Sequence, residues 1–269
     1  MELPKISIVT PSYNQGRYLE QTIRSVLGQQ YPNLEYIIMD GGSTDNSVEI
    51  IKRYADKLAY WQSKRDRGQA DAIAQGFAMS TGAILGWLNS DDLLLPDCLF
   101  SVAHKFPQNG TIVALAGRCI LIGTSGEPLK VSLPIRRTWT DMLFYGHGLI
   151  QMATFWTRTA YDQVGGLDIS LQFGFDAELF VKLRRLGEIA ITSDYLAAFR
   201  LHPSSKTSTM QNIYQIEKQL IRERFGKGSL PSVSRMFQRI RFSKRIRDRL
   251  AWEKDKAQVR KLLAFAKKG

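Results

Sequence analysis

The run Asn89-Ser90-Asp91-Asp92 places two adjacent carboxylates directly after the apolar segment 84–88. Neighbouring like charges repel each other and are costly to desolvate, so proteins usually balance such a pair with a cation or a cationic partner. Mg²⁺ and Mn²⁺ prefer oxygen ligands of this kind and commonly arrive bound to a diphosphate. The run therefore predicts a divalent-cation site at a strand end. A helix N-cap cluster ahead of Pro96 is the alternative.

Other polar residues follow strand-like segments in the same way. Thr10 ends the segment 6–10, and Asp40 follows the segment 36–39 and precedes two glycines. A ligand can approach closely over bare backbone of that kind, although Asp40 is also typical of a turn residue that caps the next helix. Asp66, in the run 64–69, is a weaker signal, because a solvated charged loop explains it almost as well.

Two further positions carry chemistry in the second half of the chain. Asp176 and Glu178 stand where a helix is expected to begin, and acidic residues are favoured there by the helix dipole alone. The functional interpretation is that one of the two takes a proton from an attacking hydroxyl. His202 lies in a loop with Ser204, Ser205 and Lys206. This setting predicts a metal or phosphate contact, with a structural histidine as the alternative.

Strand-like and helical patterns alternate through the first hundred residues and position these side chains. Strands are expected at 6–10, 36–39, 58–62 and 84–88, with helical stripes between them. Such alternation predicts a parallel sheet covered by helices on both faces, where ligands bind beyond the carboxyl ends of the strands. In the less regular second half, strands are expected at 112–122 and 151–157 and a helix at 177–187. After Lys206 the pattern is helical, with a break at 226–231.

The net charge of +12 in 269 residues is confined to the C-terminal part of the chain. Residues 1–210 contain 20 basic and 20 acidic residues, whereas residues 211–269 contain 17 and 5. The main domain is therefore neutral, and a high isoelectric point is not by itself an indication of nucleic-acid binding.

Cysteine usage and hydropathy bear on location. Cys98 and Cys119 lie in apolar surroundings with no zinc spacing and no disulfide framework, which fits a reducing compartment. No leader peptide opens the chain, and no apolar run approaches the length of a membrane span. We therefore expect a cytoplasmic protein. A peripheral position at the inner face of the cell membrane is a further expectation, which rests on the C-terminal residues described below.

Several motifs taken together resemble the inverting, nucleotide-sugar-dependent glycosyltransferases of the GT-A fold known as family 2. The resemblance covers about residues 5–206 and follows the family's order. It rests on these segments: Ser7 to Asn14, Ile38 to Asp45, Gly68 to Ala72, Trp87 to Asp92, Thr154 to Trp156, Val164 to Asp168 and Asp176 to Leu179. It implies an α/β fold of Rossmann-like GT-A type, with a mixed, mainly parallel sheet flanked by helices. The expected domains are a catalytic domain at 1–209 and a basic helical extension at 210–269.

The resemblance also implies roles for individual residues. The nucleotide donor would be bound by Thr10, Pro11, Tyr13, Asp40, Asp66, Gly68 and Asp91. Asp92 is expected to be the direct ligand of a Mn²⁺ or Mg²⁺ cofactor, with Asp91 bridging to ribose or metal and His202 assisting. Many relatives have an aspartate at the position of Asn89, which leaves the number of metal-binding carboxylates open. Asp176 aligns with the catalytic base, with Glu178 as a second candidate because Phe175 replaces the usual preceding glutamate.

The implied reaction transfers a sugar, with inversion, from a nucleotide-diphosphate sugar to a hydroxyl of a glycan or lipid-linked acceptor, in cell-surface polysaccharide synthesis. In residues 230–269, basic residues interleave with an apolar stripe, which indicates binding to an anionic membrane surface. The stripe consists of Val233, Met236, Phe237, Ile240, Ile246 and Leu250. A helix that packs its stripe on the catalytic domain is the alternative.

Two other functions are considered. A magnesium-dependent sugar-phosphate nucleotidyltransferase shares the acidic metal site, but its glycine-rich basic phosphate loop is poorly matched by residues 14–17. A nucleic-acid-binding protein would use the basic tail, which carries few aromatic residues and no recognisable motif. Such binding would be nonspecific and strongly salt-dependent, so no specific nucleic-acid partner is expected.

Overall fold

A computed structural model describes residues 2–106, 112–206, 210–226 and 235–266. Nine strands form one mixed sheet, ordered β3-β2-β1-β4-β8-β6-β9-β5, with β7 paired to β6. The strands are β1 (Ile6–Ser12), β2 (Leu34–Asp40), β3 (Tyr60–Ser63), β4 (Ile84–Trp87), β5 (Leu93–Leu94), β6 (Ile112–Ile122), β7 (Pro128–Ser132), β8 (Thr154–Thr157) and β9 (Glu188–Arg200). The four expected N-terminal strands are thus present.

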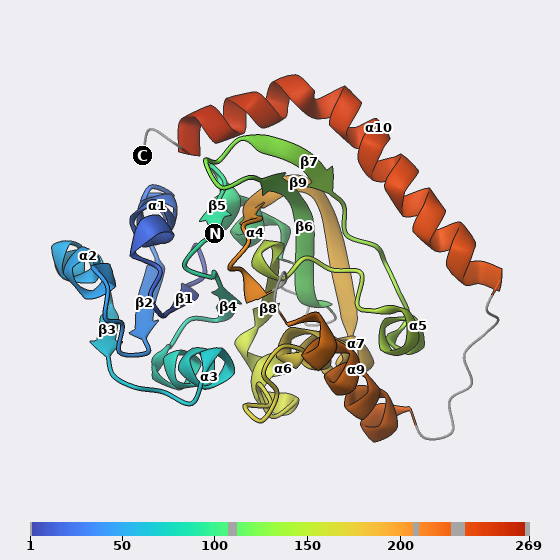
Figure 1. Ribbon diagram of the computed structural model, residues 1–269, viewed down its shortest axis with the longest axis horizontal. Helices are drawn as coiled ribbons and strands as arrows, with labels where there is room; N and C mark the ends of the chain where they lie inside the picture. The colour runs from blue at the N-terminus through green and yellow to red at the C-terminus, as the bar shows by residue number, and fades with distance from the viewer. Residues whose placement is uncertain (1, 107–111, 207–209, 227–234, 267–269) are drawn as a thin grey trace.

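Helices cover both faces of this sheet (Figure 1). They are α1 (Gly16–Leu27), α2 (Ser47–Arg53), α3 (Gln69–Met79), α4 (Cys98–Lys105), α5 (Trp139–Tyr145), α6 (Arg158–Gln163), α7 (Phe175–Leu186), α9 (Gln211–Phe225) and α10 (Arg235–Ala266). The expected strand at 151–157 is half right, because residues 151–153 form a 3₁₀ turn and only β8 is extended. The expected break in the tail lies mostly outside the described residues.

Two apolar layers hold the helices on the sheet. On one face, α1, α2 and α4 bury their stripes against the first strands, through side chains such as Leu19, Ile23 and Leu99. On the other face, α3, α6 and α7 pack through Phe77, Tyr161, Phe180 and their neighbours. The contact between α3 and β1 is so close that a Cβ on Gly76 would come within 2.6 Å of Val9. Strands buried on both faces explain the continuous apolar runs in the sequence.

Strand register sets where the polar turns lie. Strands β1, β2, β3 and β4 are parallel, with Ser12 beside Asp40 and Asp40 beside Ser63. The chain leaves β4 through residues 88–92 and then forms β5, which pairs antiparallel with β9. The acidic run after β4 therefore lies beside the end of β9. The expected mixed sheet flanked by helices is confirmed.

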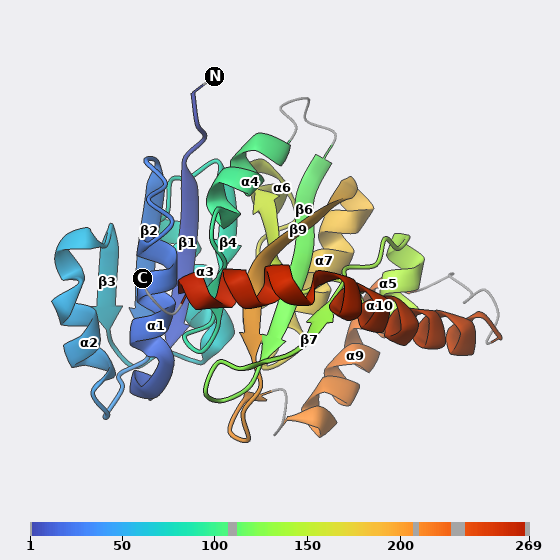
Figure 2. The ribbon, with the colours of Figure 1, turned by 90° about the horizontal axis from the view of Figure 1, so that it is seen from above.

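The helix α10 crosses the molecule over β7 (Figure 2). Its C-terminal half buries Val259 and Leu263 against β5, β6, β7 and β9. Among the stripe residues named above, only Ile246 and Leu250 have described side chains, and these are 43% and 64% exposed. The later part of α10 therefore packs on the sheet through residues beyond the named stripe, while the role of the stripe and the domain boundary at 209 stay predictions.

This packing predicts a stability difference within one helix. Leu263→Ala is expected to lower the free energy of unfolding by about 3 kcal/mol, because it leaves a cavity under α10. Leu250→Ala, a matched control on the exposed face, is expected to change it by less than about 0.5 kcal/mol. Urea unfolding of the full chain measures both values. Equal effects of the two substitutions would show that α10 does not dock as described.

Candidate active site

Three parallel strands deliver polar residues to one edge of the sheet. Ser12, Asp40 and Ser63 are neighbours in register at the ends of β1, β2 and β3. The Asp40 carboxylate is 1% exposed, and its Oδ2 accepts hydrogen bonds from Gly42 N, Ser43 N and Ser63 Oγ at 3.1, 2.9 and 2.7 Å. Asp40 therefore organises the turn after β2 but does not cap α2, which begins at Ser47. Its contact with a nucleotide stays a prediction.

Residues at the end of β1 differ in accessibility. Thr10 is fully buried, and its hydroxyl lies 3.1 Å from Tyr36 Oη. Pro11 is buried too, whereas the Tyr13 side chain is 61% exposed. The buried hydroxyl of Ser12 has no hydrogen-bond partner among the described residues. This edge thus combines an exposed ring with an unsatisfied polar atom, both of which suit a polar ligand.

Asp66 lies against the same edge. Its Oδ1 accepts from Gly68 N at 2.8 Å, and its Oδ2 is so close to Gly41 that a Cβ there would come within 2.8 Å. Gly68 has φ +116°, a conformation that L side chains rarely adopt. Burial raises the pKa of Asp66, and the charges of Asp71 and Asp40 add to this shift. The structure therefore brings Asp40, Asp66 and Gly68 together, as predicted.

The acidic run after β4 meets the loop after β9. Oδ2 of Asp91 lies 2.9 Å from Nε2 of His202, and the Asp91 side chain is 16% exposed. The other ring nitrogen, Nδ1, lies 2.9 Å from Ser204 Oγ, and the ring of Tyr18 stands 5.0 Å away between centroids. Two residues that are 111 positions apart in the sequence thus form one polar pair, with oxygen and nitrogen ligands suited to a divalent cation.

Asp92 is buried more deeply than Asp91. It is fully buried, and its Oδ1 accepts from Arg200 N at 2.9 Å while its Oδ2 accepts from Asn89 Nδ2 at 3.2 Å. Burial raises the pKa of Asp92 well above its ordinary value, and the charge of Asp91 adds to the shift. Both oxygens bond to the protein, as both ring nitrogens of His202 do, so the expectation that Asp92 is the direct metal ligand stays a prediction.

The same contacts explain why an amide stands at position 89. Asn89 donates to Asp92 and accepts from Gln69 Nε2 at 2.7 Å. A carboxylate at this position has no proton to donate and would face the carboxylate of Asp92.

Arg200, which sequence reasoning missed, connects the acidic run after β4 with helix α1 and the turn after β6. Its guanidinium is buried, with the residue 1% exposed, and its Nε donates to the backbone oxygen of Asp91 at 2.9 Å. Its terminal nitrogens donate to Gln21 Oε1 and to the carbonyls of Gly123 and Thr124. The guanidinium carbon lies 4.7 Å from the centroid of the Tyr18 ring. The only sequence signal was an arginine two residues before His202.

Asp176 stands in the first turn of α7, as predicted. Its side chain is 25% exposed, and its Oδ2 lies 3.8 Å from Nε2 of His147. Burial raises the pKa of Asp176, while His147 opposes this shift. Burial lowers the pKa of His147. A partly exposed carboxylate with a raised pKa, beside a histidine, has the properties of a general base.

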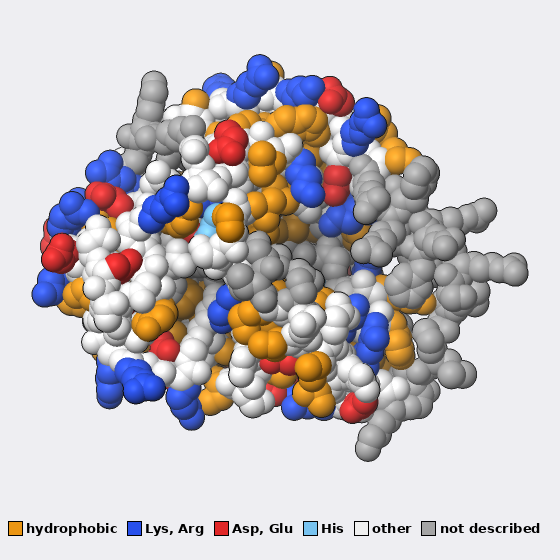
Figure 3. Space-filling model, viewed as in Figure 1, with side chains coloured by type: hydrophobic (Ala, Val, Ile, Leu, Met, Phe, Trp, Pro, Cys, Tyr) orange, Lys and Arg blue, Asp and Glu red, His pale blue; other side chains and the backbone are white. Residues whose placement is uncertain are grey.

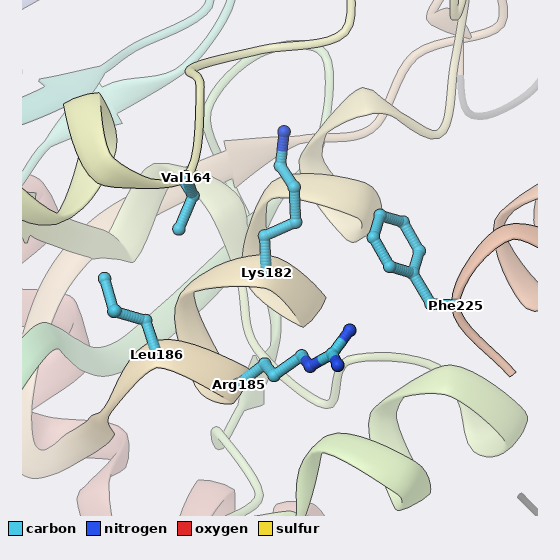
Figure 4. A pocket seen from close by; sticks show the side chains of 5 residues that line it. All are labelled: Val164, Lys182, Arg185, Leu186 and Phe225. Carbon is cyan, nitrogen blue, oxygen red and sulfur yellow. The ribbon is translucent and has the colours of Figure 1, made fainter.

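Glu178 lies on another side of the same helix. It is 2% exposed, and Lys182 Nζ and Arg224 Nη1 lie 2.9 and 3.6 Å from its carboxylate oxygens. Lys182 also lines a pocket with Val164, Arg185, Leu186 and Phe225 (Figure 4). None of the residues predicted to do chemistry lines that pocket. This burial and ion pairing favour a structural role for Glu178.

The described residues contain no cluster of three or more His, Cys, Asp or Glu side chains that would enclose a metal ion. The Asp91 carboxylate nevertheless fits a cation that takes its remaining ligands from a diphosphate and water, as Mg²⁺ usually does, and His202 would add a nitrogen ligand.

The buried guanidinium predicts a measurable stability effect. Arg200→Met is expected to lower the free energy of unfolding by about 3 kcal/mol, because Asp92 and several carbonyls lose their buried cationic partner. Arg200→Lys keeps the positive charge but not the planar set of guanidinium donors, so its loss of unfolding free energy is expected to be intermediate. The control Arg53→Met removes an exposed ion pair and should cost less than about 1 kcal/mol. Urea unfolding decides, and similar small losses in all three variants would contradict the described role.

Comparisons with known proteins identify similar sequences and folds. An uncharacterized glycosyltransferase of Rickettsia typhi is 28% identical over 78% of this chain and 68% of its own. One from Mycobacterium tuberculosis is 30% identical over 66% and 68%. One similar solved structure is that of Staphylococcus aureus TarS, residues 1–349, in complex with UDP-GlcNAc. It matches with a TM-score of 0.65 and 17% sequence identity, over 84% of this chain and 68% of the TarS chain.

A second solved structure extends the likeness. The mannosyltransferase PcManGT of Pyrobaculum calidifontis, in complex with GDP-Man and Mn²⁺, matches with TM-score 0.57 and 19% identity, over 74% of this chain and 57% of that one. These two likenesses establish the GT-A type of fold. The family model described as "Glycosyl transferase family 2" matches residues 7–159, which is more than half of the chain. The chain belongs to glycosyl transferase family 2.

Proposed function

We propose that this glycosyltransferase moves a sugar, with inversion, from a nucleotide-diphosphate sugar to an acceptor hydroxyl with the help of Mn²⁺ or Mg²⁺. The observation that carries the proposal is the pairing of Asp91 with His202 beyond the end of β4. Asp40 and Asp66 meet beyond β2 and β3, at the carboxyl ends of strands that run parallel to β4. The family match favours sugar transfer over nucleotidyl transfer and over nucleic-acid binding.

The donor would bind along the ends of β1 and β2. Tyr13 offers an exposed ring to a base, and Ser12 offers an unsatisfied hydroxyl. Thr10, Pro11, Asp40, Asp66 and Gly68 would shape the pocket, with the bare backbone at 41–42 allowing close approach. The UDP-GlcNAc and GDP-Man bound to the two structural neighbours support a nucleotide-sugar donor.

In this proposal Asp91 and His202 hold the divalent cation. Asp92 helps to position Asp91 through its own hydrogen bonds to Arg200 N and Asn89. A cation bound there with the donor would offset the charge that develops on the leaving diphosphate. Arg200 would keep Asp91 and His202 at a fixed separation, because it bonds to the backbone of residue 91 and lies two residues before His202.

Asp176 would act as the general base. Its carboxylate would accept the proton of the acceptor hydroxyl while the oxygen attacks the sugar from the face opposite the diphosphate, which inverts the anomeric centre. Because burial raises the pKa of Asp176, the base would become protonated at a higher pH than an ordinary aspartate does.

The acceptor would be a glycan or a lipid-linked saccharide of a cell-surface polysaccharide, reached from an anionic membrane surface. Lys and Arg side chains gather with hydrophobic ones along the rim formed by α10 (Figure 3). Ile246 and Leu250 are exposed one turn apart, beside exposed Arg247 and Arg249. Such a face suits anionic headgroups. No helix in the described part of the chain has the length and apolarity needed to span a membrane.

Nucleotide binding is expected to depend on Asp91. Calorimetric titration with UDP, GDP and dTDP in the presence of Mn²⁺ should detect at least one that binds, and EDTA should weaken that binding. Asp91→Asn should weaken it by about 10- to 100-fold, because a carboxylate ligand is lost. The exposed control Asp97→Asn should leave it unchanged. Equal affinity with and without EDTA, or no loss in Asp91→Asn, would refute the metal assignment.

The base assignment is tested by hydrolysis of whichever nucleotide sugar the titrations identify. Asp176→Asn is expected to reduce kcat by about 10²- to 10⁴-fold with nucleotide affinity retained. The wild-type rate should fall as the pH drops through the raised pKa of Asp176. This fall is the acidic limb of the pH–rate profile, and the profile of the variant should lack it. Glu178→Gln should mainly lower stability. A greater loss of kcat in Glu178→Gln than in Asp176→Asn would reverse the assignment.

Membrane binding is tested by flotation with vesicles. Vesicles containing phosphatidylglycerol should carry the protein upward, whereas neutral phosphatidylcholine vesicles should not. The double variant Ile246→Ser/Leu250→Ser should lose flotation, while Leu186→Ser, which changes a side chain of similar exposure on α7, should retain it. Equal flotation with anionic and neutral vesicles, or unchanged flotation of the double variant, would argue against membrane binding through this surface.

A further inference from the structure

A side chain from α9 holds the loop that leads into the catalytic helix. Oε1 of Glu217 accepts a hydrogen bond from Gln172 N at 2.6 Å, and its Oε2 accepts from Phe173 N and Gly174 N at 2.9 and 2.6 Å. Glu217 is only 5% exposed. Successive N–H groups before a helix form a cradle for an anion, and here the chain fills it with its own carboxylate.

The helix that supplies Glu217 is firmly anchored. Ile221 is buried in the core on the α7 side of the sheet. Arg222 donates to the carbonyls of Leu143 and Phe144 at the end of α5, and Arg224 pairs with Asp168 at 2.6 Å. A carboxylate on an anchored helix can define the position of a loop, whereas one on a mobile segment cannot.

A second charged side chain links the same loop to the donor edge. Lys206 Nζ donates to Gln172 O at 3.3 Å. Burial lowers the pKa of Lys206, and the charges of Glu217 and Asp66 oppose that shift. The loop 172–174 is therefore bonded to both Glu217 and Lys206, and Lys206 also lies within the field of Asp66.

We propose that Glu217 is a positioning residue for sugar transfer, which fixes the loop 172–174 and thereby the carboxylate of Asp176 two residues later. The proposal rests on the proposed function of Asp176 as the general base. It also makes α9, which the sequence placed in a separate extension, part of the machinery around the reacting hydroxyl.

A simpler alternative is that Glu217 only caps the N-terminus of α7 and adds stability. The two roles differ in their effect on the rate of the reaction. His147, Tyr214 and Glu217 are the titratable groups that act on Asp176, from the segment before the 3₁₀ turn at 151–153 and from α9. The Glu217 charge raises the pKa of Asp176, and His147 lowers it. Neutralising Glu217 should therefore lower the pKa of Asp176 in either role, so the two roles are separated by kcat: a capping role alone leaves kcat unchanged, whereas a positioning role lowers it.

The test compares Glu217→Gln with Glu223→Gln in the full chain. Glu223 lies on the exposed side of the same helix, so the control removes the same charge without touching the loop. Hydrogen–deuterium exchange of the 172–176 amides should accelerate about tenfold in Glu217→Gln, because charge-assisted hydrogen bonds are weakened. The control should exchange like the wild type.

Kinetics of nucleotide-sugar hydrolysis supply the second readout. In Glu217→Gln, kcat should fall about 10- to 100-fold, as expected for a displaced catalytic group, and the acidic limb should move to lower pH. Affinity for the nucleotide with Mn²⁺ should stay unchanged. Unaltered exchange, or faster exchange with unaltered kcat, overturns the proposal.

Failure of the proposed function is distinguishable from failure of this inference. If the wild type hydrolyses no nucleotide sugar, the proposed function fails, while amide exchange of the loop remains measurable. Faster exchange of the 172–176 amides in Glu217→Gln than in Glu223→Gln then supports the contact between Glu217 and the loop. Equal exchange in the two variants overturns it.

Discussion

The architecture around the site depends on one buried cation, the guanidinium of Arg200. A charge in the protein interior is tolerated only when its donors are satisfied, and Arg200 satisfies them with carbonyls and a side chain from three separate segments. Those segments are the acidic run after β4, the turn after β6 and helix α1. Removing the arginine would leave Asp92 buried without that counter-charge. The same constraint therefore stabilises the fold and fixes the separation of Asp91 from His202.

Charge compensation on this scale gives the two adjacent aspartates different roles. Asp92 faces the interior, where a backbone amide and Asn89 occupy its oxygens, and Asp91 faces His202 near the surface. A comparable division exists in α7. Asp176 is partly exposed beside His147, whereas Glu178 is buried between Lys182 and Arg224. In both pairs the more accessible carboxylate is the one to which we assign a role in the proposed reaction, and the buried one contacts the protein interior.

Sequence reasoning predicted the elements whose information is local. The apolar runs at β1, β2 and β4 and the glycine turns after them were recognisable because burial and turn chemistry act within a few residues. The roles of Arg200 and Glu217 were not predictable in this way, because they depend on contacts between distant parts of the sequence. The partners of Arg200 lie between 76 and 179 positions away from it. Those of Glu217 lie between 43 and 45 positions away. The inward orientation of Asp92 was missed for the same reason, since it follows from the pairing of β5 with β9.

The central claim is that Asp91 and His202 hold a divalent cation with the donor diphosphate. Crystals grown with Mn²⁺ and the nucleotide diphosphate that binds most tightly would test it through anomalous diffraction at the manganese edge. The account predicts one anomalous peak within coordination distance of the Asp91 carboxylate and of His202 Nε2, with Asp92 still bonded to the amide of Arg200. A peak bound by other side chains, or a nucleotide bound with no peak beside it, would contradict the claim.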